Sequence, residues 1–147
     1  MLIVAKRTIG LGLVAVAIAM VVAGCSRPGT APTVPAAGIL LLADKPLADV
    51  SIVFVPTSGR PAYGVTNAAG KFTMSTFRRD DGAVAGNHRV MLDVPDPGRP
   101  EAGTPEARSY RPKPLPFAAR YGAIATTDLE VSLPAAGSTN LVLRLKP

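Results

Sequence analysis

The chain has 147 residues and a formal net charge of +6, from 16 Lys and Arg against 10 Asp and Glu. This length suits one domain of ordinary size, and a single cysteine excludes a disulfide framework within the chain. Three Tyr, four Phe and no Trp are few aromatic side chains, so the modest basic excess argues against a nucleic-acid partner. Fifteen prolines and fourteen glycines divide the sequence into short pieces, which argues against long helices.

The first 24 residues have the pattern of a secretory signal peptide. Lys6 and Arg7 precede an uncharged, mostly apolar run over residues 8–23, and Ala23 and Gly24 supply small residues at its end. The run is shorter than the ~20 residues that span a bilayer comfortably. We therefore expect cleavage after Gly24, and the pattern leaves an uncleaved N-terminal anchor open as an alternative. Loss of residues 1–24 removes Lys6 and Arg7 and lowers the net charge from +6 to +4.

The tetrapeptide Val22-Ala23-Gly24-Cys25 resembles a bacterial lipobox, in which an aliphatic residue and two small residues precede a cysteine. In that family the thiol takes a diacylglycerol through a thioether, and a peptidase cuts before the cysteine. The resemblance implies that Gly24 and Cys25 flank the cleavage site and that Cys25 carries the lipid. It predicts a lipoprotein anchored to a membrane of the bacterial cell envelope, either in the outer membrane or facing the periplasm. A chance cysteine behind an ordinary signal peptide is the competing interpretation.

Residues 25–37 are rich in proline and small side chains, which predicts a solvated tether behind the lipidated Cys25. From residue 38 to 147, apolar and polar side chains alternate with period two between turn residues, which predicts short β-strands. The expected strands are residues 38–43, 50–55, 63–66, 71–77, 88–94, 128–133 and 140–145. Residues 117–121 are expected to form one helical turn or irregular cover. We therefore predict an all-β domain over residues 38–147, a seven-stranded β-sandwich with one solvated face per sheet.

The clearest local signal is a β-hairpin. Residues 63–66 and 71–77 read as its two strands, with Phe72 and Met74 on one face of the second. Residues 67–70 read as its turn, and Gly70 suits a backbone with positive φ. An earlier turn is expected at residues 44–46.

The stretch from Gly38 to Val94 resembles the carboxypeptidase regulatory-like domain, a transthyretin-like (prealbumin-like) family common in bacterial surface proteins. The matching motifs are Gly38, Lys45-Pro46-Leu47-Ala48-Asp49-Val50, Ile52-Val53-Phe54-Val55-Pro56, Val65-Thr66-Asn67-Ala68-Ala69-Gly70-Lys71-Phe72 and Gly86-Asn87-His88-Arg89-Val90. With Arg120-Tyr121 and Thr127-Asp128-Leu129, the chain is similar to small lipoproteins of planctomycete-like bacteria. The resemblance implies a seven-stranded sandwich of transthyretin-like or Ig-like Greek-key type, and it says little about function.

Candidate catalytic and metal-binding residues are few. His88 is the single histidine and Cys25 lies at the expected anchor, so we expect neither a zinc site nor a His-based triad, and His88 reads as a strand residue. Asp80-Asp81-Gly82 would need several further oxygen ligands to hold Ca²⁺, so a solvated charged loop is expected there. We find no paired nucleophile and base and no phosphate-binding loop, and we predict a protein without catalytic residues, metal or cofactor.

Residues 95–116 are the most unusual part of the expected domain. They hold seven prolines and several basic side chains, which predicts an exposed, extended loop. Two interpretations stay open: a variable surface insertion, and a recognition loop for a partner. The candidate partner-binding residues of the second are Arg99, Arg108, Tyr110, Arg111, Lys113 and Phe117. The expected function is a lipid-anchored, non-catalytic envelope module, structural or binding a protein or glycan. The alternative is a lipoprotein that binds a small molecule or carbohydrate.

The lipobox interpretation makes a direct prediction. Replacing Cys25 by Ala removes the sulfur that would take the diacylglycerol, so the variant should no longer incorporate radioactive palmitate when expressed in a bacterial host. The next residue offers a control, since Ser26→Ala leaves the thiol in place and should label like the original chain. Labelling that persists in Cys25→Ala would contradict lipidation at this site.

Overall fold

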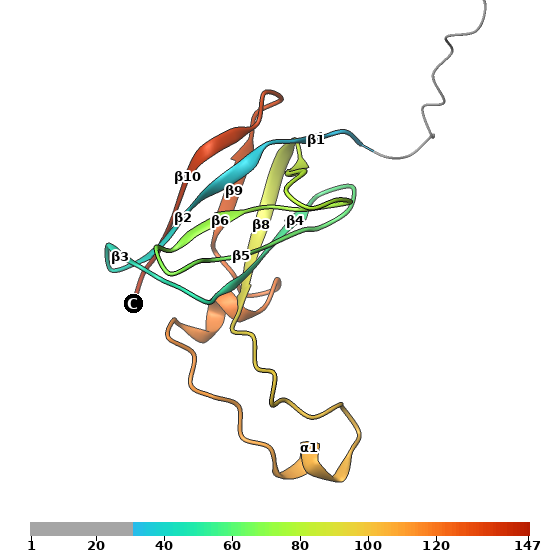
Figure 1. Cartoon of the computed structure of the whole chain (residues 1–147), viewed down its shortest axis with the longest axis vertical. Coiled ribbons are helices and arrows are strands. Elements are labelled where there is room, and N and C mark those ends of the chain that lie inside the picture. Colours follow the sequence, from blue (N-terminus) through green and yellow to red (C-terminus); the bar gives the residue numbers. More distant parts are fainter. Residues whose placement is uncertain (1–30) are drawn as a thin grey trace, which may run out of the picture. The chain divides into compact units, whose positions relative to one another are not determined.

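A computed structural model describes residues 31–147 (Figure 1), so Gly24 and Cys25, with the expected cleavage and lipidation, lie outside the described residues. The described part is mostly β, as the all-β prediction states. Its strands are β1 (Thr33–Val34), β2 (Ala36–Leu42), β3 (Lys45–Pro46), β4 (Ser51–Pro56), β5 (Ala62–Val65), β6 (Lys71–Thr73), β7 (Ala83–Val84), β8 (Gly86–Asp93), β9 (Glu130–Leu133) and β10 (Ser138–Leu145). Two short helices are present, α1 (Pro105–Ser109) and the 3₁₀ helix η1 (Ala119–Gly122). Neither is long and apolar enough to cross a membrane.

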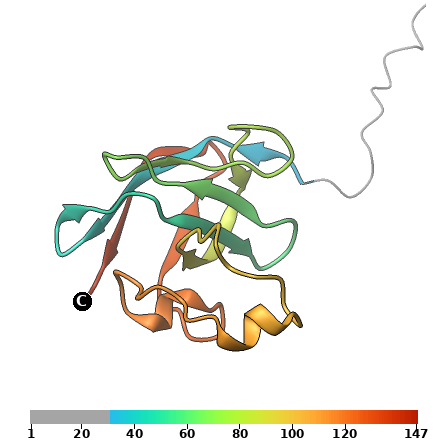
Figure 2. The ribbon, with the colours of Figure 1, turned by 60° about the horizontal axis from the view of Figure 1, so that its bottom comes forward.

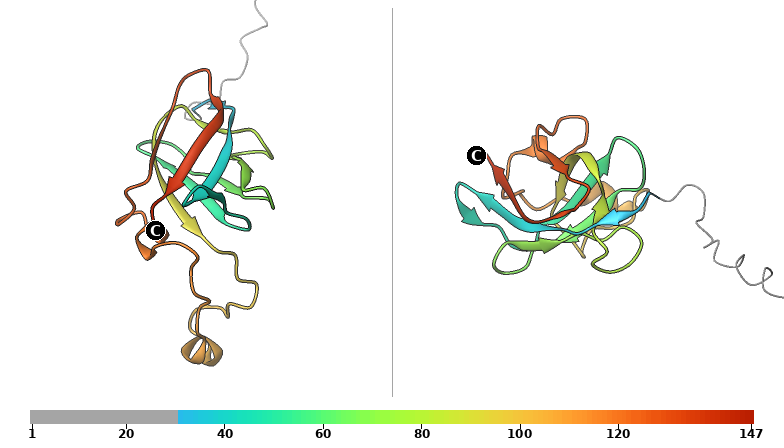
Figure 3. Two further views of the ribbon diagram at one scale, coloured as in Figure 1. Left: turned by 90° about the vertical axis from the view of Figure 1, so that its left-hand side faces the viewer. Right: turned by 90° about the horizontal axis from the view of Figure 1, so that it is seen from above.

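The strands form two four-stranded sheets and one small pair. The first sheet has the order β5-β4-β8-β9, and every neighbouring pair in it is antiparallel. In the second sheet β2 is central, with β10 parallel to it on one side and β3 and β6 antiparallel to it on the other. Figure 3 shows β10 and β2 running side by side. β1 and β7 make a separate antiparallel pair.

The two large sheets share one apolar core. Alternate residues of β4 and β8 are fully or almost fully buried, and those of β10 and β2 face the same cluster. Phe54 of β4 meets Phe72 of β6 across the sheets, edge to face, with 6.1 Å between ring centroids. Since no disulfide is available, burial of these side chains at ~1.5–3 kcal/mol each is the main favourable term for folding. The core members from the strands that the two sheets contribute include Leu40, Ile52, Phe54, Phe72, Val90, Leu92, Val131, Leu133, Leu143 and Leu145.

The expected strands correspond in chain order to β2, β4, β5, β6, β8, β9 and β10, the strands longer than two residues. The alternation also placed Phe72 and Met74 on one face, and both side chains are buried. The strand expected over residues 71–77 is shorter and ends at Thr73. The two-residue strands β1, β3 and β7 were not predicted, since so short a segment has no measurable period.

The turn expected at residues 44–46 lies one residue earlier. Ala43 and Asp44 have φ of 48° and 64°, the left-handed values that a two-residue hairpin between twisted strands requires. Lys45 and Pro46 are already the returning strand β3 and pair with Leu42 and Leu41 of β2.

The predicted hairpin around residues 67–70 is not a regular hairpin. Gly70 has the expected positive φ of 70°, but β5 pairs with β4 in one sheet while β6 pairs with β2 in the other. Between the two arms of the turn, Tyr63 and Ser75 form an antiparallel bridge, and the N–H of Asn67 donates to the carbonyl of Lys71 at 2.9 Å. The turn therefore carries the chain from one sheet to the other, because each strand finds more ladder partners in its own sheet.

The fold begins inside the stretch predicted as tether. Thr33 and Val34 pair with Val84 and Ala83, and Ala36 is buried at 2% exposure. Proline-rich composition suggested a solvated segment, but the backbone of residues 33–37 finds tertiary partners that composition does not reveal.

Gly38, the first residue of the family resemblance, has a steric role. A Cβ atom added there would lie 2.2 Å from the carbonyl oxygen of Leu141 in β10. The parallel pairing of β2 with β10 therefore requires a residue without a side chain at this position.

Gly38→Ala should destabilise the fold by about 1–3 kcal/mol, because the added methyl group must push β10 away from β2. Thermal or urea unfolding of the full-length chain, followed by circular dichroism, measures the difference. Gly98→Ala is a matched control, since its Cβ would meet only the Asp96 carboxylate at 3.5 Å. Equal stability of the two variants would contradict the close approach of β2 and β10.

Candidate functional site

The segment of residues 95–116, called the arm below, leaves β8 after Asp93 and returns to the domain at Phe117. It projects from the sheets and carries α1 at its far end (Figures 1 and 3). The arm is mostly exposed, as predicted, but it is not extended throughout. Thr104 caps α1 by accepting a hydrogen bond from the N–H of Ala107 at 3.3 Å, and Pro105 follows the cap. Thr-Pro-Glu is a helix-start signal that could have been found in the sequence.

Phe117 was predicted as an exposed anchor for a partner, and this prediction is wrong. Its side chain is 6% exposed and packs edge to face on Tyr121, with 6.5 Å between ring centroids. Tyr121 is itself 2% exposed in η1. In Figure 2, which brings this end of the domain forward, η1 and the arm lie together there. In the sequence, an aromatic residue after a proline-rich loop is equally compatible with an exposed contact and with a core side chain. In the structure, Phe117 packs in the core.

Two more of the candidate residues are engaged within the molecule. The hydroxyl of Tyr110 donates a hydrogen bond to the carboxylate of Asp96, which joins the two limbs of the arm. Arg99 lies 3.9 Å from the carboxylate of Asp93, and both side chains are about half exposed. An ion pair so exposed contributes little to stability. The hydrogen bond of Tyr110 and the weak ion pair of Arg99 are thus contacts within the molecule near the base of the arm.

The remaining candidates stay on the surface. Arg108 on α1, Arg111 and Lys113 are exposed, and Arg111 donates only a long 3.4 Å hydrogen bond to the carbonyl of Tyr110. No Asp or Glu lies between residues 107 and 118, so the returning limb carries only positive charge. All six residues of the proline segment (residues 111–116) are exposed.

The two limbs of the arm approach each other where they join the domain. Val94 and Asp96 of the outgoing limb and Pro112 and Leu115 of the returning limb line one small pocket of about 170 Å³. Leu92 of β8 also lines this pocket, which gives it an apolar side. The arm can therefore be shortened between these points without moving the strands that hold it.

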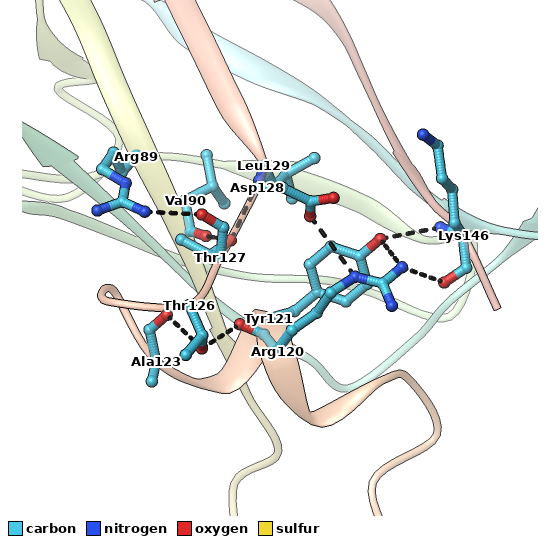
Figure 4. A network of polar contacts seen from close by, with 10 residues as sticks. All are labelled: Arg89, Val90, Arg120, Tyr121, Ala123, Thr126, Thr127, Asp128, Leu129 and Lys146. Carbon is cyan, nitrogen blue, oxygen red and sulfur yellow. Dashed lines mark hydrogen bonds and ion pairs between the residues drawn. The ribbon is translucent and has the colours of Figure 1, made fainter.

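A polar network beneath the returning limb fixes its attachment (Figure 4). The Tyr121 hydroxyl accepts hydrogen bonds from the N–H of Lys146 at 3.1 Å and from the Arg120 guanidinium at 2.9 Å. The same guanidinium lies over the Tyr121 ring, 4.6 Å from its centroid. η1 is thus tied to the end of β10. Arg120-Tyr121, part of the family resemblance, has a structural role here.

The second late motif of the resemblance also holds the chain in place. The Thr127 hydroxyl donates to the carbonyl of Val90 at 2.7 Å, and the Arg89 guanidinium donates to the Thr127 carbonyl at 2.8 Å (Figure 4). Leu129 donates its N–H to the Thr127 hydroxyl at 3.2 Å. Thr127 is 3% exposed, so these bonds satisfy polar groups that burial would otherwise penalise.

His88 is a buried strand residue. It is 2% exposed, and its Nε2 lies 2.7 Å from the carbonyl oxygen of Val84. Because a carbonyl only accepts, Nε2 carries the proton and donates. The ring also packs on Phe54, with 5.6 Å between centroids. The imidazole therefore supports the turn between β7 and β8.

The Asp80-Asp81-Gly82 loop is held by its own backbone. The Asp81 carboxylate accepts hydrogen bonds from the N–H groups of Thr76 at 2.6 Å, Phe77 at 3.0 Å and Arg78 at 3.0 Å. Asp80 lies 3.8 Å from Arg79 in an exposed ion pair. Within residues 31–147, no three His, Cys, Asp or Glu side chains gather as metal ligands would.

The pKa of Asp81 is lowered by this arrangement. Partial burial acts to raise the pKa of the carboxyl group, but the N–H donors of Thr76, Phe77 and Arg78, with its own N–H, outweigh burial and favour the charged form. The unfolded chain has no such donors, so the charged carboxylate stabilises the folded state.

An open groove of about 670 Å³ lies where β5 faces β6. Tyr63 and Val65 border it and are 55% and 56% exposed, and Lys71, Arg79 and Asp80 add charged groups. Sequence reasoning missed this site, because the groove exists only where the two sheets diverge. A half-exposed tyrosine beside polar groups is the kind of surface that can stack on a sugar ring.

The arm and β1 lie at opposite ends of the domain (Figures 1 and 3). β1 pairs with β7, which directly precedes Gly86 at the start of β8, and the arm follows Asp93 at the end of β8. Eight residues of strand at ~3.3 Å each separate the two ends by about 25 Å.

Comparison of the chain with protein-family models, curated proteins and solved structures finds no match. The resemblance to the carboxypeptidase regulatory-like domain therefore stays a prediction, as does the seven-stranded topology that it implies. The mostly β character, the two four-stranded sheets and their common core are properties of the structure itself.

Asp81→Asn should lower stability at neutral pH by about 1 kcal/mol, because the neutral amide is a weaker acceptor for the three loop N–H groups. Since the folded-state pKa of Asp81 is below its unfolded value, its contribution is complete above about pH 4 and is lost as the pH falls through the folded pKa. The difference between the variant and the original chain should therefore shrink in acid, as measured by urea unfolding at several pH values. A stability difference between Asp81→Asn and the original chain that does not change with pH would contradict the role of the charge. Asp80→Asn is the matched control.

Proposed function

We propose that this protein is a lipid-anchored, non-catalytic module of the bacterial cell envelope, in which a carboxypeptidase regulatory-like β-sandwich presents the arm to a protein partner. The observation that carries the proposal is the position of the arm at the end of the domain opposite β1. Cys25 precedes β1 by only eight residues, so a lipid on Cys25 attaches the domain at the β1 end.

With such an anchor, the arm would lie at the end of the domain farther from the point of attachment. The seven residues between Cys25 and Thr33 can span at most about 25–28 Å when fully extended. The domain then adds the length of β8, about 25 Å, between the anchored end and the base of the arm. An exposed, largely uncovered arm at the outer end of such a module is well placed to meet another component of the envelope.

The non-catalytic part of the proposal rests on how the candidate reactive groups are used. His88 donates to a backbone carbonyl in the core, and Asp81 caps its own loop. Both side chains serve the fold, and neither opens onto the arm or the groove as a base or nucleophile would.

Binding of a carbohydrate or small molecule is the second candidate, and the groove beside Tyr63 is the observation that favours it. The groove is wide open and has a single exposed aromatic ring on its border, that of Tyr63, while Phe72 in its lining is buried; Lys71 and Arg79 lie nearby. A protein-binding arm is preferred because it presents a longer exposed surface and needs no second aromatic platform.

Deletion of residues 97–114 should abolish partner binding and leave the fold intact, because Asp96 and Leu115 line the same pocket and can be joined. The full-length chain and the deletion variant, both in detergent, are compared by pull-down from envelope extract of their own organism and by thermal unfolding. A stoichiometric protein captured only by the original chain supports the proposal.

Tyr63→Ala provides the control for the groove, since it removes the exposed ring without touching the arm. Capture of the same protein by the deletion variant would rule out the arm. Glycan-array binding that survives the deletion and fails in Tyr63→Ala would move the function to the second candidate.

A further inference from the structure

The proline segment (residues 111–116) has a repeating sequence in which every second residue is proline, Arg-Pro-Lys-Pro-Leu-Pro. The ring of each proline holds its φ near −65°, and the residue before a proline is kept out of the helical region. Residues near both ends of the segment fit this geometry: Tyr110, just before it, has φ −63° and ψ 135°, and Ala118, two residues after it, has φ −62° and ψ 137°. These are the angles of a polyproline II helix.

Both ends of the segment are held inside the molecule. Tyr110 donates to Asp96 at one end, and Phe117 is buried against Tyr121 at the other. Tyr110 and Phe117 were predicted as contacts for a partner, and they instead clamp the exposed residues between them. Most of the conformational entropy that binding would remove is therefore already lost in the folded chain.

Three residues make one turn of a polyproline II helix, so Pro112 and Leu115 share one edge and form an apolar strip. Leu115 is 40% exposed, although few large apolar side chains of residues 31–147 are exposed. Arg111 and Lys113 lie on the neighbouring edges; residues 107–118 contain no Asp or Glu, and Asp93 and Asp96 of the outgoing side line the pocket that Lys113 borders. The pocket beneath the segment, lined by Leu92 and Val94, offers an apolar recess beside the strip.

We infer that the proline segment is the surface by which the arm binds its partner, and that this partner is a protein with a groove lined by aromatic rings and acidic side chains. Aromatic grooves bind preformed polyproline II segments through their apolar edge and free carbonyl groups. Acidic side chains at the rim of the groove complement Arg111 and Lys113. This inference rests on the proposed function and adds to it the contact residues and the chemistry of the partner.

The test uses the photoreactive amino acid p-benzoylphenylalanine at Leu115 of the full-length chain, in cells of its own organism. Asn87, exposed at the opposite end of β8, is the control position. One discrete protein adduct from position 115, absent from position 87, is expected.

Two sets of substitutions then separate the geometry from the charge. Replacing Pro112, Pro114 and Pro116 by Ala keeps the charges and removes the polyproline bias, and the adduct should fall about tenfold because the preformed backbone is lost. Arg111→Glu with Lys113→Glu keeps the prolines and should reduce the adduct by a similar factor. Lys45→Glu with Arg60→Glu, which makes the same change in net charge at two exposed sites outside the arm and the groove, should stay within about twofold. Thermal unfolding verifies that each variant is folded.

The outcomes distinguish this inference from the proposed function. An adduct that survives the triple alanine variant would overturn recognition of a polyproline II segment, and an adduct to lipid or glycan alone would overturn a protein partner. Absence of any adduct from position 115, while deletion of residues 97–114 still abolishes capture of a partner, would overturn the proline segment as the contact and leave the arm intact as the binding element. If the deletion does not affect capture of the partner, the arm as the binding element and the proline segment as its contact are both overturned.

Discussion

The structure depends on the burial of β4 between two neighbouring strands. β4 pairs with β5 on one side and along six residues with β8 on the other, and Ile52 and Phe54 are fully buried. Phe54 also reaches Phe72 of the other sheet and the ring of His88. Without a disulfide, this contact between the two sheets holds them as one unit, because a sheet with one exposed apolar face is not stable alone. β8, which carries the arm, is positioned by its ladder with β4.

The second constraint lies at the end of the domain where the arm returns. Phe117 and Tyr121 close the core there, and the Tyr121 hydroxyl joins η1 to the last residues of β10. These contacts explain how a proline-rich arm with few hydrogen bonds of its own leaves and re-enters the fold at defined points. The proline segment (residues 111–116), which is the proposed binding surface, stays exposed because Tyr110 and Phe117 hold its two ends inside the molecule. In the proposed function, attachment at the β1 end and recognition by the arm would lie at opposite ends of β8.

Much of the local structure could be predicted because its causes are local. Alternation identified the strands and the side chains that share a face, as at Phe72 and Met74, since the side-chain period of a strand is two whatever its partner is. Gly70 was identified as a turn residue because only its own backbone decides the positive φ. The predicted hairpin around Gly70 is present only in part, at its turn and at the bridge between Tyr63 and Ser75. β5 and β6 pair mainly with strands distant in sequence, and no pattern within residues 63–77 indicates those partners.

By itself, the sequence determined the mostly β character of residues 38–147, the faces of the strands and the exposure of the arm, because period, proline geometry and turn chemistry act over a few residues. It also contains a tetrapeptide that resembles a lipobox, which lies outside the described residues. Only the tertiary structure decided that β10 runs parallel to β2, that Phe117 belongs to the core and that the fold begins by Thr33. Each of these depends on which apolar surfaces and unpaired backbone groups meet in space, and that is settled by packing of the whole chain.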